Sequence, residues 1–129
     1  MQNPSPEHQR LVSTLIEHFR EKLGYKIMNA SIAGFPEPNK HGRHEPDIVA
    51  MDSNGVLQIA EAKATNEDLM SETAREQFID FSNRVMADTN TPVPFHIVVY
   101  KANEPFLITR LNQLGLGSAI GNRIKIWTL

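Results

Sequence analysis

Residues 46–63 read PDIVAMDSNGVLQIAEAK, and this stretch decides how the centre of the chain folds. Apolar residues, several of them β-branched, fill 47–51 and again 56–63, which is typical of strands. Between them, residues 52–55 (DSNG) form a turn signal, because Asn and Gly tolerate the backbone conformations that a tight turn requires. We therefore predict that the two strands pair as a β-hairpin.

The predicted hairpin would bring three charged side chains together. Side chains alternate between the two faces along a strand, so Glu61 and Lys63 project to the same side, together with Leu57 and Ile59. The turn folds the strand that begins at Asp47 back against them, so Asp47 can come level with Glu61. Two carboxylates and one ammonium group then converge near the end of one sheet face.

A divalent cation would suit such a cluster. Two close carboxylates repel one another unless a cation or a proton lies between them. Magnesium favours one or two carboxylates, with water and phosphate oxygens completing its shell, and here Asp47, Glu61 and the backbone carbonyl of Ala62 would form the protein part. The metal can polarise a phosphate and lower the pKa of a bound water. Lys63 can orient that water or stabilise the charge that develops on phosphorus.

The alternative interpretation is that Glu61 and Lys63 form an ordinary ion pair on a solvated strand face. However, Asp47 and Glu61 lie in strands otherwise dominated by Ile, Val, Ala, Met and Leu. Burial of unpaired charges in such strands would destabilise the fold without a compensating partner. The sequence therefore favours a functional site.

Before the hairpin, the sequence predicts one helix and one strand. Residues 6–23 have the apolar spacing of one helix face, and Gly24 follows as a C-terminal cap. The apolar positions are Leu11, Val12, Leu15, Ile16, Phe19 and Leu23. Residues 25–32 are expected to form a strand, and the Pro-, Gly- and polar-rich residues 33–46 a loop.

After the hairpin, the sequence predicts a long helix near 66–88. Thr65 and Asp68 match a capping box at its start. Its expected apolar face consists of Met70, Ala74, Phe78, Phe81 and Val85.

Three further elements complete the predicted fold. Residues 95–101 (FHIVVYK) have the composition of a buried strand, and a short helix near 104–114 and a final strand near 123–128 follow. The order α-β-β-β-α-β-α-β predicts an α/β fold with a mixed central sheet flanked by helices. We expect residues 1–129 to form a single domain.

Composition narrows the class of protein. The chain has 129 residues and a formal net charge of −2. It has no cysteine, and this excludes disulfides, iron–sulfur clusters and thiol catalysis. No window approaches the roughly 18 apolar residues of a membrane span, and the N-terminus lacks the apolar core of a signal peptide. We therefore expect a cytoplasmic protein that does not contact a membrane. The charge argues against a general nucleic-acid coat protein but allows an enzyme that uses carboxylates at its site.

The hairpin motif resembles that of the PD-(D/E)xK nuclease superfamily, whose members share a restriction-endonuclease-like core. Within it, the layout is most similar to that of the archaeal Holliday-junction resolvases. The features that support this resemblance are the helix ending in Gly24-Tyr25, the PDIVA and EAK strands, and the segment FIDFSNRV, which leads to the strand PFHIVVYK. The resemblance spans about residues 7–101. It implies that Asp47 and Glu61 ligate Mg²⁺ or Mn²⁺ and that Lys63 assists the nucleophilic water.

The resemblance also points to residues on the two long helices. The superfamily often places a glutamine near the metal on the second of them, which makes Gln77 a fourth catalytic candidate; the alternative is an ordinary surface glutamine. Many members carry a metal-binding glutamate on the first helix. Glu7 is the best positional analogue, although His8 lies closer to the apolar face and Glu17 points away from it.

A basic loop precedes Asp47, and its residues are Lys40, His41, Arg43 and His44. We expect this loop either to bind nucleic-acid phosphates beside the metal or to be a solvated polar loop.

Together these features predict a divalent-metal-dependent DNA endonuclease, structure-specific in the manner of a Holliday-junction resolvase. One domain carries one cleavage centre, so cutting both strands requires two copies, and a homodimer is the commonest solution. Two alternatives stay open. One is a nuclease-like fold that binds nucleic acid or a partner protein without cleaving, and the other is the catalytic subunit of a larger nuclease complex.

Overall fold

Five strands form one mixed sheet whose spatial order, β1-β2-β3-β4-β5, is also their order along the chain. The computed structural model describes residues 5–37 and 44–129. The strands are β1 Lys26–Ala30, β2 Ile48–Met51, β3 Leu57–Ala62, β4 Phe95–Val99 and β5 Ile124–Thr128. The first three are antiparallel neighbours, whereas β4 and β5 extend the sheet in parallel with β3. The predicted α/β class with a mixed sheet is confirmed.

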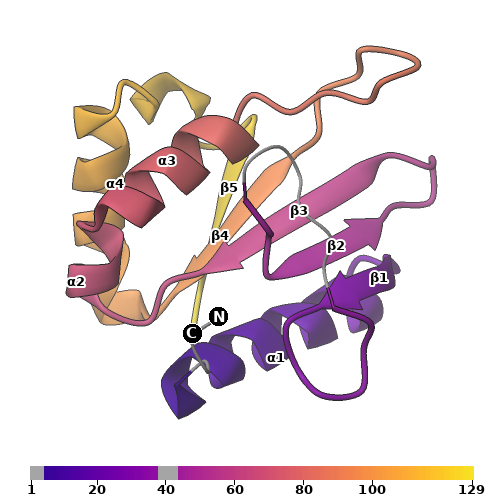
Figure 1. Cartoon of the computed structure of the whole chain (residues 1–129), viewed down its shortest axis with the longest axis horizontal. Coiled ribbons are helices and arrows are strands. Elements are labelled where there is room, and N and C mark those ends of the chain that lie inside the picture. Colours follow the sequence, from indigo (N-terminus) through magenta and orange to yellow (C-terminus); the bar gives the residue numbers. More distant parts are fainter. Residues whose placement is uncertain (1–4, 38–43) are drawn as a thin grey trace.

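Helices cover both faces of this sheet (Figure 1). Helix α1, Pro6–Glu21, packs on one face, and the other face is covered by α2 Asn66–Leu69, α3 Glu72–Phe81 and α4 Glu104–Gln113. Two short 3₁₀ helices, η1 Lys101–Asn103 and η2 Gly117–Ala119, flank α4. Within the described part of the chain, no helix combines the length and the apolarity needed to cross a membrane.

The two faces of the sheet differ in the size of the side chains they present. Alanines dominate the face towards α1, where Ala50, Ala60 and Ala62 are buried beneath its apolar stripe. On the opposite face, Phe78 and Phe81 of α3 pack against Phe95 of β4. Because alanine side chains are short, α1 can lie close to the strands near the end of β3.

The predicted hairpin joins β2 to β3 and sets the position of Asp47. Asp52 Oδ1 accepts hydrogen bonds from the backbone N–H groups of Asn54 (2.8 Å) and Val56 (3.0 Å), and Gly55 has a φ of +81°, which glycine adopts without strain. Ile48 pairs with Ala60, so the residue before β2, Asp47, lies opposite Glu61.

The helix predicted over 66–88 is wrong in its extent. It breaks at Met70 and Ser71, because the Ser71 Oγ accepts from the Ala74 N–H (3.0 Å) and begins a new helix, α3. The Arg110 side chain stabilises the break by donating to the Leu69 carbonyl at 3.1 Å. Helix α3 ends at Phe81, and the chain then forms an excursion closed by an antiparallel bridge between Val85 and Pro92.

These differences change which apolar residues are buried. Ala74, Phe78 and Phe81 are buried as predicted, whereas Met70 and Val85 are exposed because they lie outside α3. Leu23 is likewise exposed, since α1 ends at Glu21 and not at residue 23. The other predicted elements differ from the observed ones by one or two residues at their ends.

A partly buried network of hydrogen bonds, centred on the buried side chains of His96 and Gln58, crosses the sheet on its α1 face. The Trp127 Nε1–H donates to His96 Nδ1 (2.9 Å), so His96 carries its proton on Nε2, which contacts Gln58 Oε1 at 2.7 Å. The Gln58 amide donates in turn to Asp52 Oδ2 (3.1 Å) at the hairpin turn. Burial, with a smaller effect from Lys125, lowers the pKa of His96 to about 4. The neutral ring therefore links β5, β4, β3 and the turn.

The hydrogen bonds of the neutral His96 ring predict that the fold loses stability in acid. The unfolded chain binds the His96 proton near the ordinary pKa of 6.5, whereas the folded chain binds it only near 4, so stability from this residue is present above pH 6.5 and is lost as the pH falls towards 4. The loss amounts to about 3 kcal/mol of the free energy of unfolding. In urea denaturation between pH 7 and pH 4, the free energy of unfolding should fall more steeply with decreasing pH for the native protein than for His96→Gln. Equal slopes would contradict the prediction.

Candidate active site

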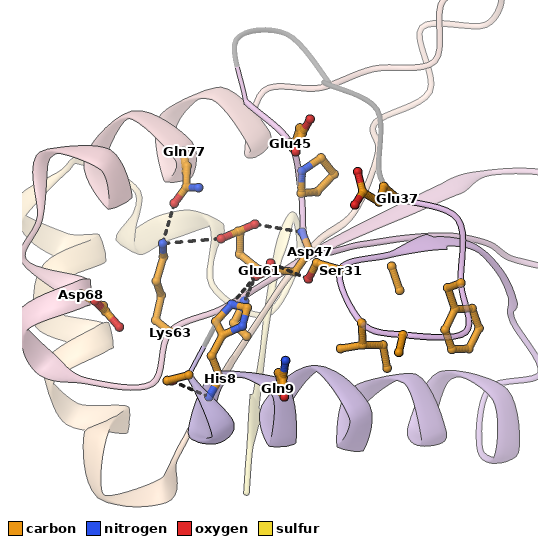
Figure 2. Close-up of a pocket in the computed structure, with 17 residues that line it drawn as sticks. His8, Gln9, Ser31, Glu37, Glu45, Asp47, Glu61, Lys63, Asp68 and Gln77 are labelled. Carbon is orange, nitrogen blue, oxygen red and sulfur yellow. Dashed lines mark hydrogen bonds and ion pairs between the residues drawn. The ribbon is translucent and has the colours of Figure 1, made fainter. Parts of the chain in front are cut away.

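A pocket of about 740 Å³ lies where β2 begins and β3 ends, between α1 and α3 (Figure 2). Its lining is acidic: the carboxyl groups that border it are those of Glu37, Glu45, Asp47, Glu61 and Asp68. Among the described residues that line it, only Lys63 and His8 can carry a positive charge. An acidic pocket of this kind favours a cation over a bare phosphate.

Asp47 lies at the centre of the pocket wall, directly before β2. Its Oδ2 accepts from the Ala62 N–H (2.9 Å) and its Oδ1 accepts from the Ser31 hydroxyl (2.9 Å). His8 Nε2, from the first turn of α1, lies 3.0 Å from the same Oδ2. Burial alone would raise the pKa of Asp47, but the hydrogen bond and the charge of His8, with smaller effects from the Ala62 and Ser31 hydrogen bonds, outweigh burial and lower it. Asp47 is therefore held as a carboxylate.

Glu61 is the most deeply buried carboxyl group of the site, with a side chain only 4% exposed. Its Oε1 accepts from the Asp47 N–H at 2.9 Å, and Lys63 Nζ lies 3.5 Å from its Oε2. Burial, together with the negative charge of Asp47, raises the pKa of Glu61 well above its ordinary value. The side chain thus lies in a place where an additional positive charge would be strongly favoured.

Lys63 is held between two acceptors. Its Nζ donates to Gln77 Oε1 (2.6 Å) on α3 and lies next to Glu61, and its side chain is 12% exposed. Figure 2 shows Gln77 reaching from α3 towards Lys63, while His8 rises from α1 towards Asp47. An ammonium group fixed in this way presents one localised charge at the pocket wall.

The donor set fits a hard divalent cation. Among the described residues, no group of three or more His, Asp or Glu side chains is already arranged around a common point. However, Mg²⁺ takes only one or two carboxylates from many proteins and completes its shell with water and phosphate. Asp47 and Glu61 would hold the ion here, and Ala62, which borders the same pocket, would contribute its carbonyl. The burial of Glu61 next to Asp47, which raises the pKa of Glu61, favours a cation at this place.

The structure brings most of the sequence-predicted site residues together. Asp47, Glu61, Ala62, Lys63 and Gln77 all line the pocket.

Other predicted residues lie elsewhere. Glu7 is exposed and does not line the pocket. His44 is partly buried with its ring against Phe81 and borders a smaller depression beside Arg75 and Asp80. The remaining residues of the predicted basic loop, Lys40, His41 and Arg43, lie outside the described residues.

Two residues that contact Asp47, His8 and Ser31, were not predicted as site residues from the sequence. His8 carries a usable signal, because it lies three and four residues before Leu11 and Val12 and so shares the buried face of α1. Ser31 has no such signal, since it follows β1 in a segment where any small polar residue would be unremarkable.

Comparisons of the chain with protein-family models, with curated proteins and with solved structures found no match. The chemistry assigned to this pocket therefore depends on the geometry of its own residues.

We predict that Glu61→Gln stabilises the metal-free protein. The folded state binds the Glu61 proton more tightly than the unfolded state does, so the native protein loses stability as the pH rises through and above the ordinary range of a glutamate. Glutamine cannot ionise and avoids this loss. Denaturation with a chelator present should give the variant a higher free energy of unfolding than the native protein near pH 8, and a smaller difference near pH 5.

The matched control is Glu17→Gln, which removes an exposed carboxylate from α1. It should change the free energy of unfolding by less than about 0.5 kcal/mol at either pH. A Glu61→Gln variant less stable than the native protein near pH 8 would show that the carboxylate is satisfied by its present neighbours.

Proposed function

We propose that this chain is a divalent-metal-dependent DNA endonuclease with a restriction-endonuclease-like core of the PD-(D/E)xK type. One observation carries the proposal. Asp47, Glu61 and Lys63, from the end of one hairpin, border a single pocket with side chains only 14%, 4% and 12% exposed. Buried charges are costly, and two carboxylates beside an ammonium group have a clear use in phosphodiester hydrolysis.

Each residue has a distinct role in the proposed reaction. Asp47 and Glu61 bind the metal, and Mg²⁺ or Mn²⁺ when bound supplies a Lewis acid and a water of lowered pKa. Lys63 places its ammonium where negative charge develops on the phosphate, or orients the attacking water. Gln77, whose Oε1 accepts from Lys63 Nζ at 2.6 Å, fixes the direction of that ammonium group.

The acidic lining of the pocket also bears on substrate binding. Glu37, Glu45 and Asp68 border the pocket beside the two central carboxylates, and the chain has a net charge of −2. A polyanion therefore meets a repulsive field unless a cation neutralises it. We infer that DNA binding at this site depends on the metal, and that a homodimer presents two such centres to a branched or duplex substrate.

A non-cleaving nucleic-acid or protein-binding module is the second candidate. It is favoured by one observation: Asp47 already contacts His8, and Lys63 already contacts Gln77 and Glu61, so the charges at the site are partly satisfied without a ligand. Such a module would tolerate loss of the Lys63 ammonium, whereas a nuclease would not.

Cleavage assays on duplex, nicked, forked, four-way and single-stranded DNA with Mg²⁺ or Mn²⁺ test the proposal. We expect Asp47→Asn and Lys63→Met to lower the rate at least about a hundredfold. Calorimetric metal titration separates their roles: Asp47→Asn should lose metal binding, whereas Lys63→Met should retain it because its ammonium is not a ligand.

Glu17→Gln, purified identically, controls for a contaminating nuclease and should cleave at the native rate. The proposal would be contradicted if the native protein left every substrate intact with either metal, or if Asp47→Asn and the native protein cleaved equally.

A further inference from the structure

His8 is the residue of α1 that reaches the candidate site. Its Nε2 lies 3.0 Å from Asp47 Oδ2, and its side chain is 20% exposed. The first turn that carries it is held by a side-chain cap, in which the Ser5 hydroxyl accepts from the His8 N–H at 3.1 Å. Beyond it, Leu11 and Val12 anchor the same helix face in the core. The position of the imidazole is therefore fixed by the packing of α1.

The second ring nitrogen of His8 leaves the imidazole able to act as a ligand. Nδ1 is buried and has no hydrogen-bond partner among the residues that the structure describes. No described donor therefore occupies the Nδ1 lone pair, and Nδ1 is able to carry the ring proton. Without a metal, Nε2 donates its proton to Asp47 Oδ2; with a cation between the two atoms, the ring proton would lie on Nδ1 and Nε2 would present its lone pair to the ion.

The separation of these two atoms matches that of neighbouring ligands on one metal ion. Ligands at about 2.1 Å from an octahedral centre lie about 3 Å apart, by simple geometry. We propose that His8 and Asp47 ligate the same ion, and that the centre consequently prefers a transition metal such as Mn²⁺ or Co²⁺ to Mg²⁺. This inference rests on the metal centre of the proposed function and specifies which ion it takes.

The preference follows from ligand chemistry. Mg²⁺ is a hard ion that favours oxygen ligands and gains little from an imidazole nitrogen, whereas first-row transition metals bind imidazole well. A centre with one nitrogen and one or two carboxylates therefore has a larger difference in affinity between transition metals and Mg²⁺ than a centre of oxygen ligands alone. Among these ions, Co²⁺ should bind more tightly than Mn²⁺.

The opposing interpretation makes His8 a counter-ion for Asp47. A protonated imidazole would then occupy the place of the metal and compete with it. The two interpretations predict opposite effects of removing the ring: loss of a ligand weakens transition-metal binding, whereas loss of a competitor strengthens the binding of every divalent ion.

Calorimetric titration of the full chain with Mg²⁺, Mn²⁺ and Co²⁺ tests the proposal. We expect His8→Ala to weaken Co²⁺ binding by about tenfold or more and Mg²⁺ binding by less than about threefold. His8→Glu, which replaces the nitrogen ligand with oxygen, should shift the ratio of affinities towards Mg²⁺. The visible absorption of bound Co²⁺, which reports its ligand set, should change in both variants.

His18→Ala is the matched control, because His18 lies on the same helix with its ring 5.6 Å from that of Trp127. It should leave all three affinities unchanged, and circular dichroism verifies that each variant is folded. Tighter binding of all ions by His8→Ala, unchanged affinity ratios in both His8 variants, or no metal binding by the native protein would overturn the inference.

These results are separable from the fate of the proposed function. A protein that binds Co²⁺ through His8 but cleaves no DNA would support this inference and contradict the endonuclease. A protein that cleaves DNA with Mg²⁺, and whose ratios of metal affinities do not depend on His8, would support the endonuclease and contradict this inference.

Discussion

The carboxylate of Asp47 is the interaction on which the site depends. It accepts hydrogen bonds from the Ala62 backbone and the Ser31 hydroxyl, and it contacts the His8 ring. One side chain thereby connects the segment after β1, the start of β2, the end of β3 and the first turn of α1. A buried carboxylate needs such donors, because it is costly to remove from water without them. The same requirement fixes the position of Glu61, which accepts from the Asp47 N–H.

The asymmetry of the sheet makes this connection possible. Short alanine side chains on one face allow α1 to lie close to β2 and β3, so His8 in its first turn reaches the carboxylate. On the other face, bulky Phe78 and Phe81 anchor α3, and Gln77 next to Phe78 reaches Lys63. The pocket thus lies between two helices that belong to separate parts of the core. Rigid supports of this kind are what a site with buried, opposing charges requires.

Much of the candidate site could be predicted from local sequence. The turn 52–55 fixes the register of the hairpin, and strand periodicity then places Asp47 opposite Glu61, with Lys63 on the same face. What failed was the extent of the second long helix. Ser71 caps the start of a new helix, although the helical spacing of apolar residues continues across this position. The spacing alone does not distinguish two consecutive helices from one continuous helix.

The sequence by itself determined the α/β class, the hairpin and the convergence of two carboxylates with one lysine, because each follows from periods of two or 3.6 residues and from one turn. Only the tertiary structure decided that His8, and not Glu7, faces Asp47, and that Ser31 completes its hydrogen bonds. Those contacts depend on the rotation of α1 about its axis and on the path of the chain after β1. Both are set by packing between residues far apart in the sequence, which no local pattern records.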